Sequence, residues 1–95
     1  MKESEIEAHL VKRVKELGGE VRKLKWVGRR GAPDRFVMVF GRSFFVELKA
    51  PGKKPSPQQS KEISVMREQG VGVWVLDSTD GVENALQIER IKAGR

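Results

Sequence analysis

Three charged residues, Asp34, Glu47 and Lys49, border the most hydrophobic part of the sequence. Asp34 precedes the apolar run 36–40, and Glu47 and Lys49 close the next run, 43–48. Charged side chains in such a context are costly unless they have partners. Carboxylates are hard oxygen ligands that suit Mg²⁺, and a nearby ammonium can orient water or neutralise charge on a phosphorane. This residue set predicts metal-assisted hydrolysis of a phosphodiester.

The two apolar runs predict a β-hairpin that brings these residues together. Gly41-Arg42 forms the expected two-residue turn, of type II′ because glycine comes first. Asp34 then lies opposite Lys49 and diagonal to Glu47. Opposed residues share a face of the sheet, so the three side chains point the same way. Leu48 faces the other side and leaves its backbone carbonyl within reach.

A structural ion cluster is the alternative interpretation. A Glu-x-Lys triplet is weak evidence by itself, because the chain contains ten Glu and ten Lys. Such a pair on a strand is usually a solvent-facing ion pair, which contributes little stability. The surrounding apolar residues favour a metal site but leave the ion cluster open.

Hydrophobic spacing predicts the elements that position this hairpin. Ile6, Leu10 and Val14 form the stripe of an amphipathic helix, and Ser56 is a good N-cap before Pro57. The order αβββαβα predicts a small α/β domain with helices packed on a mixed sheet. The expected elements are a helix over 3–17, a strand over 20–27, strands over 36–40 and 43–48 buried on both faces, a helix over 57–69, a strand over 72–76 and a helix beginning at Asp80.

The positive charge is concentrated in one segment. The chain carries a formal net charge of +6, and residues 11–35 account for all of it. A concentrated basic segment is typical of a protein that binds polyanions, most often nucleic acid, although a solvated basic face is the alternative. The candidate DNA contacts are Lys23, Lys25, Arg29, Arg30 and Arg35, with Lys53 and Lys54 as weaker candidates.

Composition excludes several other classes of protein. The 95 residues contain no cysteine, which excludes a disulfide framework, a thiolate zinc site and a cysteine nucleophile. The apolar runs are too short to cross a bilayer, and no secretory signal precedes them, so we expect an intracellular protein with one domain spanning 1–95. A phosphatase acting on small molecules is disfavoured because the chain is short and strongly basic.

Three motifs in order resemble a known nuclease family. They are G-A-P-D-R (31–35), F-V-E-L-K-A-P-G (45–52) and S-P-Q-Q (56–59), behind a first helix that contains E-S-E-I-E. Together they resemble the VRR-NUC domain, a branch of the PD-(D/E)xK superfamily, over most of the chain. The resemblance implies a restriction-endonuclease-like αβββαβ core, Mg²⁺ or Mn²⁺ as cofactor, and a bacterial or phage-encoded cytoplasmic protein similar to dimeric Holliday-junction resolvases.

The resemblance also implies roles for individual residues. Asp34, Glu47 and the backbone carbonyl of Leu48 would hold the metal, and Lys49 would be the catalytic lysine. Gln59 would be the motif glutamine on the following helix. A glutamate of the first helix would join the site.

Two of these implied residues could instead have ordinary structural roles. Glu7 is the preferred glutamate because it borders the apolar stripe, and Glu3 shares its face one turn earlier. An exposed carboxylate is also favourable near a helix N-terminus whatever its function. Gln59 would bind a catalytic carboxylate or a phosphate, or would merely cap its helix.

The residue pattern and the resemblance together predict a Mg²⁺-dependent DNA endonuclease. The resemblance implies that it is structure-selective, similar to Holliday-junction resolvases, and a homodimer. The first alternative is a basic nucleic-acid-binding module that does not cleave. The second is a purely structural or partner-binding protein, for which any affinity for DNA should depend little on salt.

Overall fold

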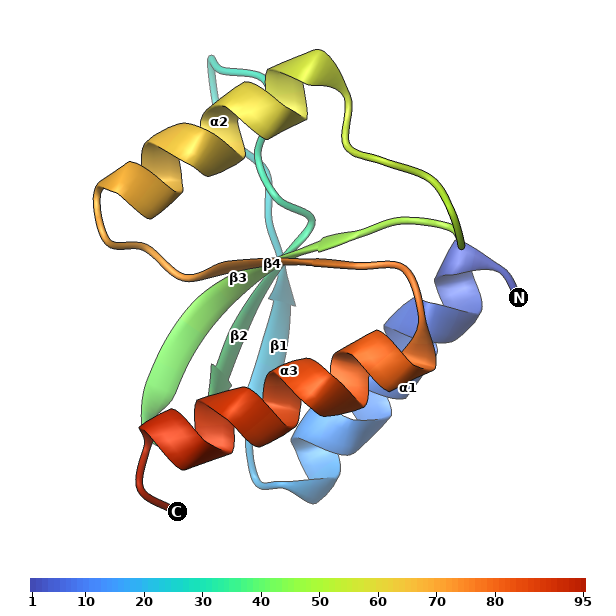
Figure 1. Cartoon of the computed structure of the whole chain (residues 1–95), viewed down its shortest axis with the longest axis vertical. Coiled ribbons are helices and arrows are strands. Elements are labelled where there is room, and N and C mark those ends of the chain that lie inside the picture. Colours follow the sequence, from blue (N-terminus) through green and yellow to red (C-terminus); the bar gives the residue numbers. More distant parts are fainter.

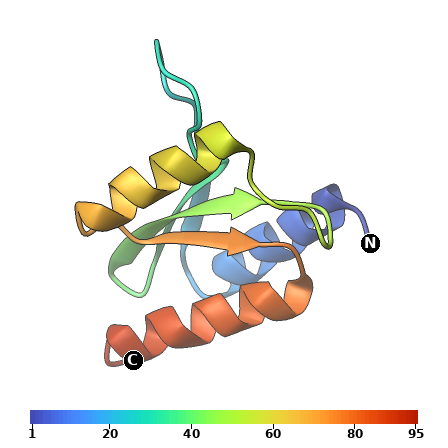
Figure 2. The ribbon, with the colours of Figure 1, turned by 45° about the horizontal axis from the view of Figure 1, so that its top comes forward.

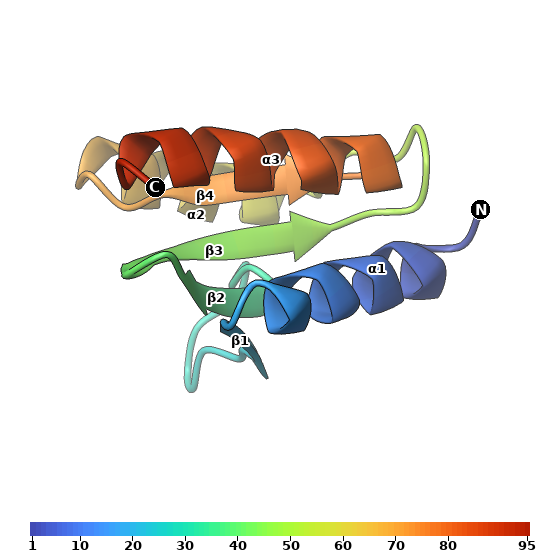
Figure 3. The ribbon, with the colours of Figure 1, turned by 90° about the horizontal axis from the view of Figure 1, so that it is seen from below.

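The chain folds into three layers, with a sheet between two layers of helices (Figure 1). The computed structural model describes all 95 residues. Helix α2 covers one face of the sheet, and α1 and α3 cover the other (Figure 3). The predicted α/β class and element order are confirmed. The elements are α1 (Glu3–Glu16), β1 (Glu20–Lys23), β2 (Arg35–Val39), β3 (Arg42–Leu48), α2 (Pro57–Glu68), β4 (Val73–Leu76) and α3 (Thr79–Lys92).

The sheet is mixed, as predicted. Its strand order is β1-β2-β3-β4, with antiparallel pairs up to β3 and a parallel β3–β4 pair. A parallel pair needs a crossover, and α2 supplies it. The hairpin strands β2 and β3 thus lie in the middle of the sheet.

Both faces of this hairpin are buried, because each is packed against helices. The face toward α1 and α3 carries the larger core, which includes Ile6, Leu10, Val37, Phe44 and Val46. The face toward α2 carries a smaller cluster of Ile63, Met66 and Val73 with partly buried aromatic residues. The smaller cluster leaves room on that face for polar side chains at the strand ends.

Serine residues cap the starts of α2 and α3. Ser56 caps α2 as predicted, since its hydroxyl accepts from the Gln59 N–H at 3.1 Å. The predicted start of the last helix at Asp80 is wrong: Ser78 is the cap and accepts from the Gly81 N–H at 2.9 Å. Asp80 is exposed in the first turn, where its charge suits the helix dipole. No helix has the length and apolar character that crossing a bilayer requires.

The predicted hairpin turn is also wrong by one position. Val39 pairs with Arg42, so Phe40 and Gly41 form the turn, with φ of 59° and 72°. Positive φ at both central residues is the pattern of a type I′ turn. Each residue of β2 is thereby paired two positions earlier on β3 than predicted. A shift by two keeps every side chain on its predicted face.

An ion cluster joins α1 to α3. Glu83 accepts from Arg13 Nε at 3.0 Å and lies 2.8 Å from His9 Nε2. The hydrogen bond from Arg13 is the main cause that lowers the pKa of Glu83, and His9 adds to it. The only histidine is therefore part of helix packing.

Candidate active site

Asp34 and Glu47 meet on the α2 face at the open end of the hairpin. Arg35 pairs with Val46, and continuing this register by one residue places Asp34 across from Glu47. The Leu48 N–H donates to Asp34 Oδ2 at 2.8 Å, which draws the carboxylate against β3. The predicted convergence of the two carboxylates is thus present in the fold, with Glu47 rather than Lys49 directly opposite Asp34.

Glu47 is fully buried, at 0% exposure, and has one positively charged partner. Lys49 Nζ lies 3.1 Å from Glu47 Oε2 and forms an ion pair with it. No well-aligned hydrogen-bond donor reaches either carboxylate oxygen. Buried charged groups without such partners are strongly unfavourable, so one lysine is an incomplete complement for two facing carboxylates.

The surroundings of Glu47 favour its protonated form. Burial is the main cause that raises the pKa of Glu47, and the negative charge of Asp34 adds to it, while Lys49 opposes both. The apolar surroundings include Phe45, two residues earlier on the same face, whose ring centroid lies 5.0 Å from that of Phe36. Its surroundings therefore make a bound proton or cation more favourable than for an ordinary carboxylate.

The donor set fits a hard divalent cation. Asp34 and Glu47 supply carboxylate oxygens, and the adjacent backbone of Leu48 supplies a carbonyl. No group of three or more His, Cys, Asp or Glu side chains is close enough to hold a metal ion. Mg²⁺ is usually bound by one or two carboxylates and keeps several waters, so two carboxylates are sufficient. Mg²⁺ would leave room in its shell for a substrate oxygen.

Glu7 does not join the two carboxylates, in contrast to the prediction. Its carboxylate accepts a hydrogen bond from the Arg35 guanidinium. Arg35 alternates with Asp34 along the strand and therefore faces α1 rather than α2. Its side chain is 13% exposed and also donates to the Asp34 carbonyl at 2.8 Å. Arg35 is thus turned away from the solvent that DNA would occupy, in contrast to its predicted role as a DNA contact. Together with Glu7 it positions Asp34 instead.

Gln59 caps the start of α2, which was the alternative interpretation of this residue. Its Oε1 accepts from the Ser56 N–H at 2.9 Å, which completes a capping box at the start of α2. This bond uses the side-chain oxygen and leaves the amide nitrogen available. The role implied by the resemblance stays a prediction.

The segment between β1 and β2 forms a basic loop that projects beyond the first turn of α2 (Figure 2). Gly31, with φ of 91°, anchors it, because a Cβ there would lie 2.7 Å from the carbonyl oxygen of Gln58. Arg29 NH2 lies 3.0 Å from Glu62 Oε1, yet 64% of the Arg29 side chain is exposed. Arg30 is exposed and has no acidic partner.

Sequence reasoning missed Glu62 as the anchor of this loop. Glu62 is 8% exposed and lies on the packed face of α2, next to Ile63. The signal was a charge at the edge of an apolar helical stripe, four residues before Met66. The remaining predicted DNA contacts are exposed as expected, at Lys23, Lys25, Lys53 and Lys54.

The fold and the two facing carboxylates define an α/β nuclease-like core. No protein-family model matches the sequence. The sequence is 47% identical over 81 residues to "Putative nuclease p44" of Acyrthosiphon pisum secondary endosymbiont phage 1, covering 84% of this chain and 87% of that protein. A solved structure described as a VRR_NUC domain superposes with a TM-score of 0.84 at 37% identity, covering 92% of this chain and 96% of that one.

Both similarities cover most of this chain and most of the protein with which it is compared. The protein belongs to the VRR-NUC family, and its fold is that of a nuclease. The resemblance stated from its motifs is confirmed.

Proposed function

We propose that this protein is a divalent-metal-dependent endonuclease that hydrolyses phosphodiester bonds in DNA. The observation that carries the proposal is the state of Glu47: fully buried, facing the carboxylate of Asp34, and balanced only by Lys49, whose Nζ lies 3.1 Å from Oε2. A fold gains nothing from such a carboxylate, because removing charges from water is costly. Strained polar groups of this kind are concentrated at functional sites.

Each residue has a distinct part in this mechanism. Asp34 and Glu47 would hold Mg²⁺ or Mn²⁺, together with the carbonyl of Leu48. When bound, the cation would activate water as a nucleophile and neutralise charge on the phosphoryl oxygens. The Lys49 ammonium contacts the buried Glu47, and the Lys49 side chain is 20% exposed. From there it would orient the attacking water or stabilise charge developing on the phosphorane.

The lack of an enclosing pocket around the site supports a polymeric substrate. None of the five concave surfaces of the molecule is lined by Asp34, Glu47 or Lys49. A small substrate would normally be enclosed in a pocket. DNA instead lies on an open surface and is held through its phosphates by basic side chains. Arg29 and Arg30, on the loop that leads directly to Asp34, are suited to this.

The finer parts of the proposal concern the form of the DNA and the assembly of the enzyme. By analogy with Holliday-junction resolvases, we propose selectivity for branched DNA and a homodimer as the active form. Light scattering with size-exclusion chromatography tests the dimer directly. A strictly monomeric enzyme that still cleaves would contradict that part alone.

The activity is tested by incubating the purified protein with labelled linear duplex, flap and four-way-junction DNA in Mg²⁺, Mn²⁺ or EDTA. We expect cleavage with either cation, none in EDTA, and faster cleavage of the branched substrates. Lys49→Ala should abolish cleavage, while Lys12→Ala, which removes an exposed lysine of α1, should not. Cleavage that persists in EDTA or in Lys49→Ala overturns the mechanism, and binding without cleavage in any cation favours a non-catalytic module.

A further inference from the structure

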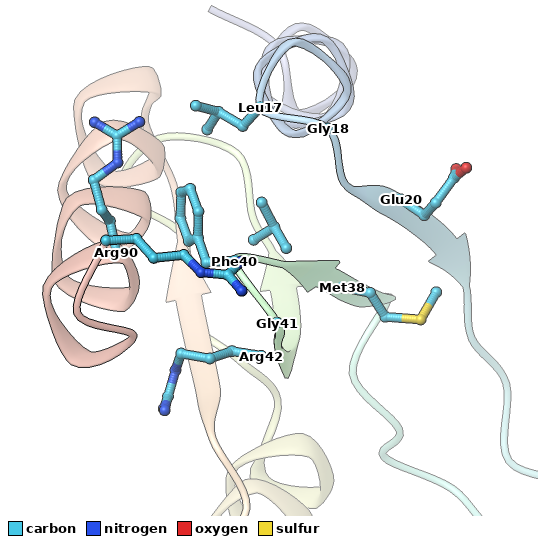
Figure 4. Close-up of a pocket in the computed structure, with 10 residues that line it drawn as sticks. Leu17, Gly18, Glu20, Met38, Phe40, Gly41, Arg42 and Arg90 are labelled. Carbon is cyan, nitrogen blue, oxygen red and sulfur yellow. The ribbon is translucent and has the colours of Figure 1, made fainter.

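A second basic surface lies at the other end of the hairpin, away from the carboxylates. It is a groove of about 720 Å³ between the C-terminal end of α1, the β2–β3 turn and the C-terminal part of α3 (Figure 4). Arg42 begins β3 at this end, and Glu47 lies five residues further on. At about 3.3 Å per residue, roughly 17 Å of strand separate the groove from the active site.

Cations surround this groove. Arg42, Arg90 and Arg95 line it, against one carboxylate, that of Glu20. Glu20 is itself paired with Arg22 at 3.1 Å. Arg90 and Arg95 have no acidic partner in the protein. No carboxylate therefore neutralises these two guanidinium groups, and guanidinium groups bind phosphate well.

Part of the groove lining is apolar and includes Leu17, Val39 and Phe40. Phe40 has a φ of 59°, a conformation in which turns favour Asn or Gly. Its ring packs against the main core on one side, and the Arg90 guanidinium lies 5.4 Å from its centroid. An aromatic residue is thus held at a position that ordinary turn preferences would give to a small polar one.

We propose that this groove binds an unpaired nucleic-acid strand, with phosphates on Arg90 and Arg95 and a base against Phe40 and Leu17. Phosphate-binding cations beside aromatic and apolar side chains are typical of single-strand binding, because unpaired bases expose their flat faces. A duplex hides these faces and would use the arginines alone. The inference rests on the proposed function for the identity of the ligand as nucleic acid, and it places a single-stranded arm of a branched substrate at this end.

The variants must separate the groove from folding. Arg42 is unsuitable because its Nε donates to the buried Glu89 at 2.7 Å, so its removal would leave Glu89 without its cation. Arg90→Gln removes a free cation. Phe40→Asn removes the ring and places a residue that type I′ turns favour. Lys12→Gln removes one exposed positive charge of α1 outside the groove and serves as the matched control.

The test uses fluorescence anisotropy in EDTA, where no cleavage occurs, with thermal melting of each variant alongside. The probes are a blunt duplex, the same duplex with a tail of ten thymidines, and the ten-thymidine strand alone. We expect the tail to tighten binding by the wild-type protein about tenfold, and Arg90→Gln and Phe40→Asn each to remove most of this gain while blunt-duplex affinity stays within about twofold. Lys12→Gln should keep the gain.

A tail that gives no gain, or a gain that survives in both variants, overturns the inference. Displacement of the thymidine strand by polyglutamate as readily as by unlabelled thymidine strand also overturns it, because the groove would then bind any polyanion. The proposed nuclease activity is measured separately in Mg²⁺ on a blunt substrate. A negative result for the groove therefore does not contradict the proposed nuclease activity, and a negative cleavage assay does not contradict binding in the groove.

Discussion

Asp34 and Glu47 face each other across the end of the β2–β3 hairpin, and the charge of Asp34 adds to burial in raising the pKa of Glu47. The Leu48 N–H that binds Asp34 Oδ2 holds the carboxylate in this position. Two like charges held together in a buried place store free energy that a cation would release.

Replacing the buried charge should stabilise the protein and abolish its activity. We expect Glu47→Gln to raise the stability of the metal-free protein by about 1 kcal/mol, because it removes a buried charge that faces Asp34 and that Lys49 balances only in part. For a domain of this size that corresponds to about 4–8 °C in Tm. Differential scanning calorimetry in EDTA measures the change, and the same variant should not cleave DNA.

The control for this variant is Glu68→Gln, which neutralises an exposed glutamate at the end of α2. It should leave both the Tm and cleavage unchanged. A Tm of Glu47→Gln well below that of the wild type would show that Glu47 is a stabilising structural residue.

Metal binding should protect the wild-type protein against unfolding. A ligand that binds only the folded state raises its stability by about 2.7 kcal/mol at one hundred times its Kd. Mg²⁺ or Mn²⁺ should therefore raise the Tm of the wild type, whereas Glu47→Gln should show a much smaller shift. An equal shift in both proteins would place the cation elsewhere.

The pH dependence follows from the raised pKa of Glu47. Between the ordinary value of 4.5 and the raised value, the folded protein keeps a proton that the unfolded chain has lost. The stability of the metal-free protein should therefore fall as pH rises through this interval, while metal affinity and cleavage rise. Asp34→Asn removes one cause of the raised pKa, so the titration of Glu47, followed by NMR of its carboxyl carbon, should move to lower pH. Movement to higher pH would contradict the assigned cause.

The two arginines of the basic loop should behave differently. Arg30 has no protein partner, so Arg30→Gln should weaken DNA binding and reduce the slope of log affinity against log salt by about 1, without changing the Tm. Arg29→Gln should also lower the Tm, because it leaves the buried Glu62 without its cation. Arg22→Gln, on β1, is the control for the loss of one arginine. An unchanged salt slope in Arg30→Gln would exclude Arg30 from DNA contact.

The anchor of this loop should be sensitive to a single methyl group. Gly31→Ala should destabilise the protein by about 1–3 kcal/mol, because Ala disfavours positive φ and its Cβ would meet the carbonyl of Gln58. Gly28→Ala is a matched control: Gly28 also has positive φ, of 71°, but a Cβ there meets nothing. Urea denaturation compares the two variants. Equal losses would show that contact with α2 does not anchor the loop.

Much of the fold and the central pair of the site were predictable from local patterns. Alternating apolar residues determine which side chains share a face, and this pattern is unaffected when a strand slips by two positions. Asp34, Glu47 and Lys49 were therefore placed on one face although the predicted turn was wrong. The Ser56 cap was equally local, because its partner Gln59 lies three residues away.

The sequence by itself determined the class of fold, the family and the face that carries the carboxylates, because these depend on short-range patterns and motifs. Tertiary structure decided the rest. The turn lies at Phe40-Gly41 because the Phe40 ring packs against the core and beside Arg90, from distant parts of the chain. The pairing of Glu7 with Arg35 likewise depends on how α1 crosses the sheet, which no local pattern specifies.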